Sequence, residues 1–218
     1  MEQKEILTER QKKVIGLVAQ SPLCSFIYLS GGTALAEYYL HHRLSDDLDF
    51  FSLEKIDMNV LAGFVEEVKE MLGAKKVSYE RVFDRNLYFF SFGKDEELKM
   101  EFTQYSFEPL DKKLKKNGIK VDSFHDIAAG KLMALLDRFD PKDFVDLYFI
   151  LKKRSLAFVR KDAEKKFGIH ISNLFLGAEL SKVERIHALP KMIIPLTISD
   201  LKSKIVGEAK KLGVNLIK

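Results

Sequence analysis

The first pattern along the chain is a helical recurrence of apolar positions. It runs from Thr8 to Ala19 and stops at Ser21-Pro22, because proline favours an extended or turning backbone just before it. Residues 59–72 are also amphipathic and end at Gly73, a residue type that commonly ends helices. Both segments are therefore predicted to be helices.

Between these two helices, short apolar runs indicate strands. The segments FIYLS (residues 26–30) and DLDFFS (residues 47–52) are each expected to form one. Gly31-Gly32 ends the first run, and Thr33 can cap the helix that ALAEYYLHH predicts next. The expected order is strand, glycine turn, a short helix ending near Arg43, and strand.

Three aromatic and β-branched segments then predict a β-meander. They are KKVSYERVF, NLYFFSFG and ELKMEFTQYS, and they begin at Lys75, Asn86 and Glu97. The short polar connections DR and KDE join them, as is typical of hairpins. The three strands should therefore be antiparallel neighbours. The alternating aromatic residues of LYFFSF could stack on a base, but we expect them to be core.

The composition changes after Pro109, where the lysine-rich segment LDKKLKKNGIKV begins. We place a boundary here, between a core at residues 1–110 and a second part at residues 111–218 in which every element is expected to be helical. The predicted fold class is α+β, a small mixed β-sheet with flanking helices followed by a helical C-terminal half.

Helix-start signals are clear in the second part. Ser123 and Asp126 resemble a capping box, and Asp140-Pro141 is a cap followed by proline at the first helical position. Further helices are expected over residues 155–167, 172–180 and 199–212.

The composition is that of a soluble globular protein, with 218 residues, 46% hydrophobic and 31% charged. No apolar run approaches the roughly 20 residues that a membrane helix needs, and the first residues are charged where a signal peptide would be hydrophobic. We therefore expect a cytoplasmic protein without a membrane partner. Cys24, the lone cysteine, excludes an internal disulfide and a multi-cysteine metal site.

Charge is distributed unevenly along the chain. Residues 1–110 carry 13 Lys and Arg against 19 Asp and Glu, a net −6, which leaves 23 against 13, a net +10, for residues 111–218. An acidic half that could hold metal ions and a basic half that could hold phosphates would suit a polyphosphate or nucleic-acid substrate.

Asp47 and Asp49 lie two residues apart in a predicted strand, so both carboxylates should point to the same face. Such a pair can hold Mg²⁺ or Mn²⁺, which prefer carboxylate oxygens and substrate phosphates. Asp46 should point away. Glu101, between Met100 and Phe102 in a predicted central strand, is a candidate third metal ligand; the alternative is an outward-facing residue of a half-exposed strand.

The glycine turn before these acids suits phosphate. Gly31 and Gly32 let backbone amides approach a triphosphate, while Ser30 and Thr33 can add hydroxyl donors.

A second cluster lies in GKLMALLDRFDPKDFVDL. Lys131 and Arg138 are two helical turns apart, Lys142 opens the next helix, and Asp143 and Asp146 are one turn apart. Cationic and anionic side chains thus frame one helix junction, although a surface salt-bridge network would give the same pattern.

Other polar residues near the acids stay ambiguous. His41 and His42 could serve as a base or as ligands. We expect them instead to be polar residues at a helix C-terminus, where partial positive charge is favourable. Arg43 and Ser45 fit equally a phosphate contact and a structural role at the strand entry.

With both motifs in view, the sequence resembles the AbiEii/AbiGii-like nucleotidyltransferases. These are toxins of type IV abortive-infection toxin–antitoxin pairs and belong to the DNA polymerase β-like superfamily. The resemblance covers residues 28–151 and rests on SGGTALA…HRLSDDLDFF together with K…R…KDFVDL.

The resemblance implies a site and a reaction. Gly31 and Gly32 would hold the phosphates of a nucleoside triphosphate, Asp47 and Asp49 the metals, and Lys131 the triphosphate. Asp143 would help orient the acceptor or a cation. Arg138, Lys142 and Asp146 are supporting residues of the same motif. The second part of the chain would complete the nucleotide site.

The implied reaction moves a nucleoside monophosphate to an acceptor, which in some members is the 3′ end of tRNA. A protein hydroxyl is another acceptor to consider, and a cognate antitoxin is the implied partner. Two alternatives stay open: a small-molecule nucleotidyltransferase of the aminoglycoside type, and an inactive relative that only binds nucleotide or a partner.

Overall fold

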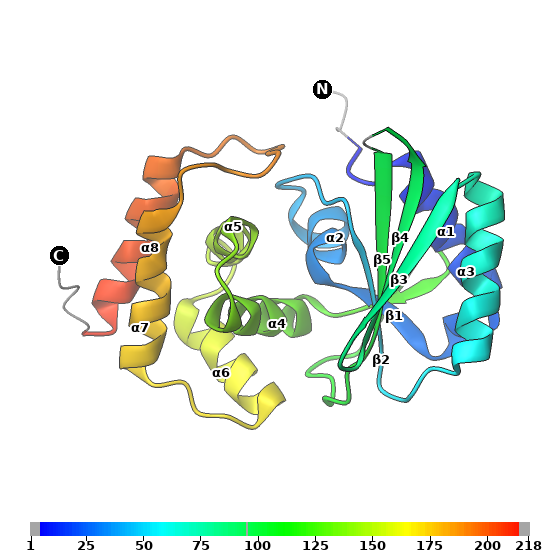
Figure 1. Ribbon diagram of the computed structural model, residues 1–218. Coiled ribbons are helices and arrows are strands. Elements are labelled where there is room, and N and C mark those ends of the chain that lie inside the picture. Colours follow the sequence, from blue (N-terminus) through cyan, green and yellow to red (C-terminus); the bar gives the residue numbers. More distant parts are fainter. Residues whose placement is uncertain (1–4, 95, 214–218) are drawn as a thin grey trace.

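A computed structural model describes residues 5–94 and 96–213. Figure 1 shows a β-sheet with α1 and α3 on one face, and α2 followed by the other helices on the opposite face. The strands are β1 (Ile27–Ser30), β2 (Leu48–Ser52), β3 (Lys76–Val82), β4 (Arg85–Gly93), β5 (Glu96–Gln104), β6 (Leu114–Lys116) and β7 (Ile119–Val121).

The seven strands form one mixed sheet in the order β3-β4-β5-β2-β1-β7-β6. The pairs β3–β4, β4–β5, β1–β2 and β6–β7 are antiparallel, whereas β2–β5 and β1–β7 are parallel. The predicted meander is confirmed. Within its KDE connection, Asp95 lies outside the described residues.

Strands β6 and β7 correct the expectation that every element after Pro109 is helical. They form a hairpin in the lysine-rich segment, closed by Asn117 and Gly118, which have φ of 49° and 81°. Asn-Gly between two short strands is a strong hairpin signal, because both positions tolerate positive φ. The sheet therefore draws on both sides of the boundary placed at residue 110, and the division itself stays a prediction.

Most helices begin close to the positions that the sequence predicts. They are α1 (Glu9–Gln20), α2 (Gly31–Leu35), α3 (Met58–Leu72), α4 (Phe124–Asp137), α5 (Pro141–Ile150), α6 (Leu156–Phe167), α7 (Asn173–Ser181) and α8 (Ile198–Lys211), with short helical turns at Pro22–Ser25, Ala36–Leu40 and Lys182–Arg185. Ser123 and Asp140 cap α4 and α5 by accepting hydrogen bonds from backbone N–H groups, as predicted. No helix in the described part of the chain is both long and apolar enough to cross a membrane.

Thr33 does not cap the helix after β1. This helix, α2, begins directly at Gly31, and the Thr33 hydroxyl lies inside it and donates to the backbone carbonyl of Asp47. The glycine turn and the acids are thus tied together by a hydrogen bond.

A hydrophobic cluster runs from Val14 of α1 to Ala209 of α8, and it holds the helical half against the sheet.

Candidate active site

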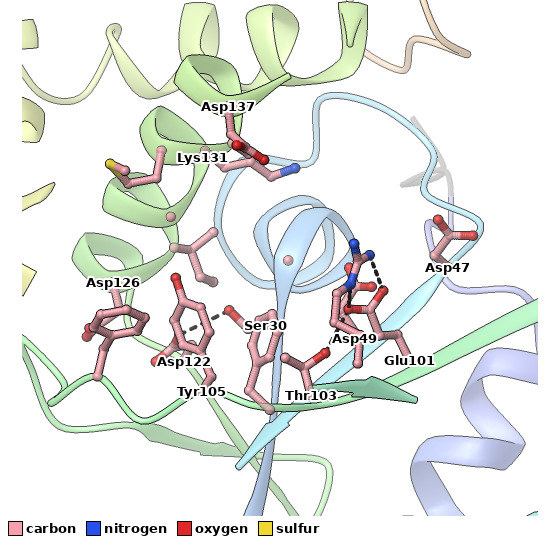
Figure 2. A pocket seen from close by; sticks show the side chains of 18 of the residues that line it. Ser30, Asp47, Asp49, Glu101, Thr103, Tyr105, Asp122, Asp126, Lys131 and Asp137 are labelled. Carbon is pink, nitrogen blue, oxygen red and sulfur yellow. Dashed lines mark hydrogen bonds and ion pairs between the residues drawn. The ribbon is translucent and has the colours of Figure 1, made fainter. Parts of the chain in front are cut away.

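One cavity of about 660 Å³ lies between the sheet and α4, within the size range of small-molecule sites. Its lining includes seven of the residues selected from the sequence: Ser30, Gly31, Asp47, Asp49, Glu101, Lys131 and Arg138. Figure 2 shows the acids of β2 and β5 toward one end, with Lys131 reaching in from α4. The two sequence motifs therefore meet at a common cavity.

Strand pairing places the acids beside one another. Asp49 of β2 is the register partner of Glu101 on β5 and of Ser30 on β1. Burial, together with the charges of Glu101 and Asp47, raises the pKa of Asp49 to about 6. Asp47 comes just before β2 and is more exposed, and in Figure 2 it lies apart from Asp49. Negative charge is thus concentrated at this end of the cavity.

Glu101 is neither unpaired nor outward-facing. It is buried, and Arg85 donates two hydrogen bonds to it, at 2.7 and 2.6 Å, while Thr103 donates a third at 2.8 Å. Although burial opposes ionisation, these bonds hold the pKa of Glu101 below its ordinary value. Glu101 is therefore already paired with protein donors, and its expected role as a third metal ligand stays a prediction.

The acids nevertheless fit a hard cation. No three His, Cys, Asp or Glu side chains in the described ranges are already grouped to hold a metal. However, Lys99 Nζ lies 3.6 Å from Asp47 Oδ2 and 3.7 Å from Glu101 Oε2, so an ammonium group already bridges two of the acids. An all-carboxylate donor set suits Mg²⁺ or Mn²⁺. Asp47, Asp49 and Glu101 supply the carboxylates at this end of the cavity.

The backbone conformation at position 31 and the nearby Asp49 side chain leave room only for glycine. The φ of Gly31 is +70°, and an added Cβ would lie only 2.1 Å from Asp49 Oδ2. A Cβ on Gly32 would meet a terminal guanidinium nitrogen of Arg43 at 2.6 Å and Lys131 Nζ at 3.5 Å, so the turn also packs against the second motif. Gly32 and Thr33 are buried and lie outside the cavity lining, and their expected contact with phosphate stays a prediction.

The second motif forms a buried charge cluster. Lys131 Nζ lies 2.7 Å from Asp146 and 3.1 Å from Asp143, and Arg138 lies 3.0 Å from Asp143. Arg43 donates two hydrogen bonds to Asp146, at 2.7 and 2.8 Å. Both aspartates are fully buried, so the alternative of a surface network is wrong. Although burial opposes ionisation, Lys131 and Arg43 hold the pKa of Asp146 well below its usual range.

Several predicted ligand contacts are corrected by this cluster. Arg43 is 2% exposed and its guanidinium is bound to Asp146, so it has the structural role and not the phosphate contact. Asp143 and Asp146 contact Lys131 and lie outside the cavity lining, as does Lys142, which is exposed. The two aspartates therefore hold the ammonium group of Lys131 in place.

His42 was expected to be a polar residue at a helix end, but it is fully buried. Its Nε2 lies 2.8 Å from Asp146 Oδ1, and burial lowers its pKa, which favours the neutral ring. His41 ends the preceding helical turn in the left-handed conformation and is exposed. The aromatic strand residues Tyr88 and Phe90 are core, as predicted.

Sequence reasoning missed the opposite end of the cavity. Asp122 follows β7 and accepts a hydrogen bond from Ser30 Oγ at 3.0 Å. Phe51, Tyr105 and Phe107 line the same end. The Asn-Gly hairpin could have revealed Asp122, since it places β7 beside β1. Arg85 and Lys99 line the acid end. Their places there depend on the register between β4 and β5, so no local sequence pattern identifies them as cavity residues.

A family model described as the nucleotidyl transferase AbiEii toxin of type IV toxin–antitoxin systems matches residues 16–213. The chain belongs to this family. AbiEii membership confirms the resemblance seen in the two motifs, and it identifies the chain as a nucleotidyltransferase. The match covers both the acid-bearing sheet and the helices that position Lys131.

Known proteins similar to this AbiEii chain include an uncharacterised protein of Aquifex aeolicus (strain VF5). It is 30% identical over 165 residues, which are 74% of this chain and 76% of that protein. JHP933 from Helicobacter pylori is 19% identical with a TM-score of 0.59, and the match covers 94% of this chain and 89% of that one. MenT4, a nucleotidyltransferase toxin from Mycobacterium tuberculosis H37Rv, is 15% identical with a TM-score of 0.54, covering 94% and 82%. These structures confirm the α+β fold.

Proposed function

We propose that this chain is a metal-dependent toxin that transfers a nucleoside monophosphate from a nucleoside triphosphate to a hydroxyl group of an acceptor. The observation that carries the proposal is the shared cavity, which Asp47 and Asp49 line from the sheet and Lys131 lines from α4. In the reaction the acceptor oxygen bonds to the α-phosphorus, the bond to the β-phosphate oxygen breaks, and pyrophosphate leaves. Such chemistry depends mainly on positioning and charge neutralisation.

Four of the lining residues, Asp47, Asp49, Lys131 and Arg138, have a part in that reaction. A bound Mg²⁺ or Mn²⁺, held by Asp47 and Asp49, would lower the pKa of the attacking hydroxyl and neutralise the leaving group. Lys131, fixed by its two buried aspartates, reaches the glycine turn and supplies a positioned cation for the triphosphate. Arg138 is half-exposed at the rim and can add a second.

We propose an RNA acceptor, with the 3′ end of tRNA as the first candidate. The β6–β7 hairpin exposes Lys115 and Lys116, and Lys112 is exposed just before it; the hairpin ends next to Asp122, which lines the cavity. Lysines of this kind neutralise backbone phosphates. A cognate antitoxin is the proposed protein partner, and the cytoplasm is the proposed location.

The test combines the purified chain with Mg²⁺, total tRNA and each of the four α-³²P-labelled nucleoside triphosphates. The expected result is label on tRNA that disappears in the Asp47→Asn/Asp49→Asn double variant, with far-ultraviolet circular dichroism showing that this variant is folded. Label on protein would move the acceptor to a protein hydroxyl. Full transfer by the double variant would contradict the proposed metal site, and no label with any triphosphate would reject the proposed reaction on RNA.

A further inference from the structure

A row of polar side chains crosses four strands at the base of the cavity. Glu101, Asp49 and Ser30 are successive register partners on β5, β2 and β1, and Asp122 continues the row directly after β7. Adjacent strands lie about 4.8 Å apart, so Asp122 is roughly 10 Å from Asp49. This is about the length of one nucleoside. A nucleotide whose phosphate lies at Asp49 can therefore place its base near Asp122.

Asp122 is a buried carboxyl group with one oxygen unpaired. It is 3% exposed, and its Oδ2 accepts the hydrogen bond from Ser30. Its Oδ1 has no hydrogen-bond partner among the residues that the structure describes. Lys166, the nearest buried cation, is paired with Asp126 instead. Buried acceptors are nearly always satisfied, so this carboxyl group, which also lines the cavity, has one acceptor left for a further donor.

Aromatic side chains line the same cavity as this carboxyl group. The rings of Phe51 and Tyr105 stack with centroids 4.8 Å apart and an interplanar angle of 26°, and Phe107 meets Tyr105 edge-on at 4.9 Å. Met133 of α4 lines the same cavity. In Figure 2, Ser30, Tyr105, Asp122 and Asp126 gather at the end away from Asp47. Aromatic rings in such a pocket bind nucleobases by stacking.

We propose that this end of the cavity binds a nucleobase with an exocyclic amino group, which donates a hydrogen bond to Asp122. The inference rests on the proposed function and specifies its substrate. Adenine and cytosine carry the amino group where hypoxanthine and uracil carry a carbonyl oxygen. A carbonyl oxygen facing the Asp122 carboxylate would leave both acceptors unpaired, so the site discriminates between the two kinds of base.

The test measures equilibrium binding of nucleotide pairs to the full chain in Mg²⁺. Non-hydrolysable analogues of ATP against ITP, and of CTP against UTP, are compared by titration calorimetry. Wild-type protein should bind the amino base roughly 10- to 100-fold more tightly, the ratio expected for one hydrogen bond to a charged group. Asp122→Asn presents an amide donor and should shift the preference toward the keto base. Asp84→Asn, a matched change at an exposed acid, should keep the wild-type ratio.

Two sets of titrations, one with triphosphates and one with monophosphates, identify whether the site binds the base of the donor nucleotide or that of the acceptor. Discrimination among triphosphates without acceptor assigns it to the donor nucleotide. Discrimination only between AMP and IMP, or between CMP and UMP, assigns it to the terminal nucleotide of the acceptor. Equal binding of amino and keto partners by the wild-type protein in both sets overturns the proposal, whether or not Asp122→Asn folds.

The transfer assay is read separately from these affinities. Selective binding without transfer would reject the proposed reaction and support the base site. Transfer with equal binding would support the reaction and reject the base site.

Discussion

Gly31 illustrates how one residue can fix the geometry of the acid end. Its positive φ and the 2.1 Å approach of Asp49 Oδ2 to a hypothetical Cβ leave no room for a side chain. Gly31→Ala should therefore displace Asp49, destabilise the fold by about 1–3 kcal/mol and lower transfer activity at least tenfold. Denaturant unfolding and the labelled-nucleotide assay measure the two effects.

A matched glycine provides the control for this substitution. Gly63 is exposed within α3 and has nothing within 4 Å of a hypothetical Cβ. Gly63→Ala should keep full activity and raise stability by about 0.5–1 kcal/mol, the difference in helix propensity. Equal activity of the two alanine variants would show that Gly31 is only a turn residue.

Asp122 should make stability depend on pH. Burial raises its pKa from 3.8 to about 6, so the folded protein binds this proton more tightly than the unfolded chain does. Stability conferred by the neutral form is lost as pH rises from about 4 to 6, for a total of about 3 kcal/mol. The charged and titratable groups around it are Lys166, Asp126, Lys113, Tyr28, Tyr39 and Tyr105.

The measurement compares wild-type protein with Asp122→Asn by urea unfolding at pH 4 and pH 7. The stability of the variant relative to wild type should rise by up to about 3 kcal/mol between these pH values, because only the wild type loses the proton. Contributions from groups that do not interact with Asp122 cancel in this difference. A difference that does not change with pH would mean that the Asp122 carboxylate is ionised at no cost in the folded protein.

At the scale of elements, the buried charge cluster joins α4, α5 and the segment after α2. Asp146 holds Lys131 and Arg43 together while contacting His42. Asp146→Asn would remove the negative charge that pairs with the buried side chains of Lys131 and Arg43. We therefore expect the free energy of unfolding to fall by about 3–5 kcal/mol. Lys142→Met, at an exposed position on the same helix, should change stability by less than about 0.5 kcal/mol. Guanidinium unfolding of both variants measures the contrast, and similar losses would contradict it.

Elements with local signals could be predicted from the sequence. Thr8, Ser123, Asp140, Ser155 and Ser172 all cap helices as their residue types and positions indicate. The β6–β7 hairpin has a local signal in its Asn-Gly turn, but its strands are only three residues long and lysine-rich, which is not typical of strands. The pairings of Glu101 with Arg85 and of Arg43 with Asp146 could not be predicted, since each depends on strand register or helix packing between distant segments.

At the scale of the whole molecule, the cavity depends on both halves of the chain. The sheet includes β7, which pairs with β1, and one hydrophobic cluster extends from α1 to α8. Lys131 from the second half lies beside the glycine turn of the first. The halves on either side of residue 110 therefore share their core, and neither completes the cavity alone.

This shared core predicts a single cooperative unfolding transition. Calorimetric and van't Hoff enthalpies should agree, and circular dichroism and tyrosine fluorescence should report the same midpoint. Two resolved transitions would instead support independent domains at residues 1–110 and 111–218.

A nucleoside triphosphate with Mg²⁺ contacts both halves in the proposed complex, so it should raise the one midpoint without splitting it. At 100 times its dissociation constant, the expected gain is about 2.7 kcal/mol. The Asp47→Asn/Asp49→Asn variant should lose most of this gain, because the metal that links the phosphates to the sheet is then weakly held.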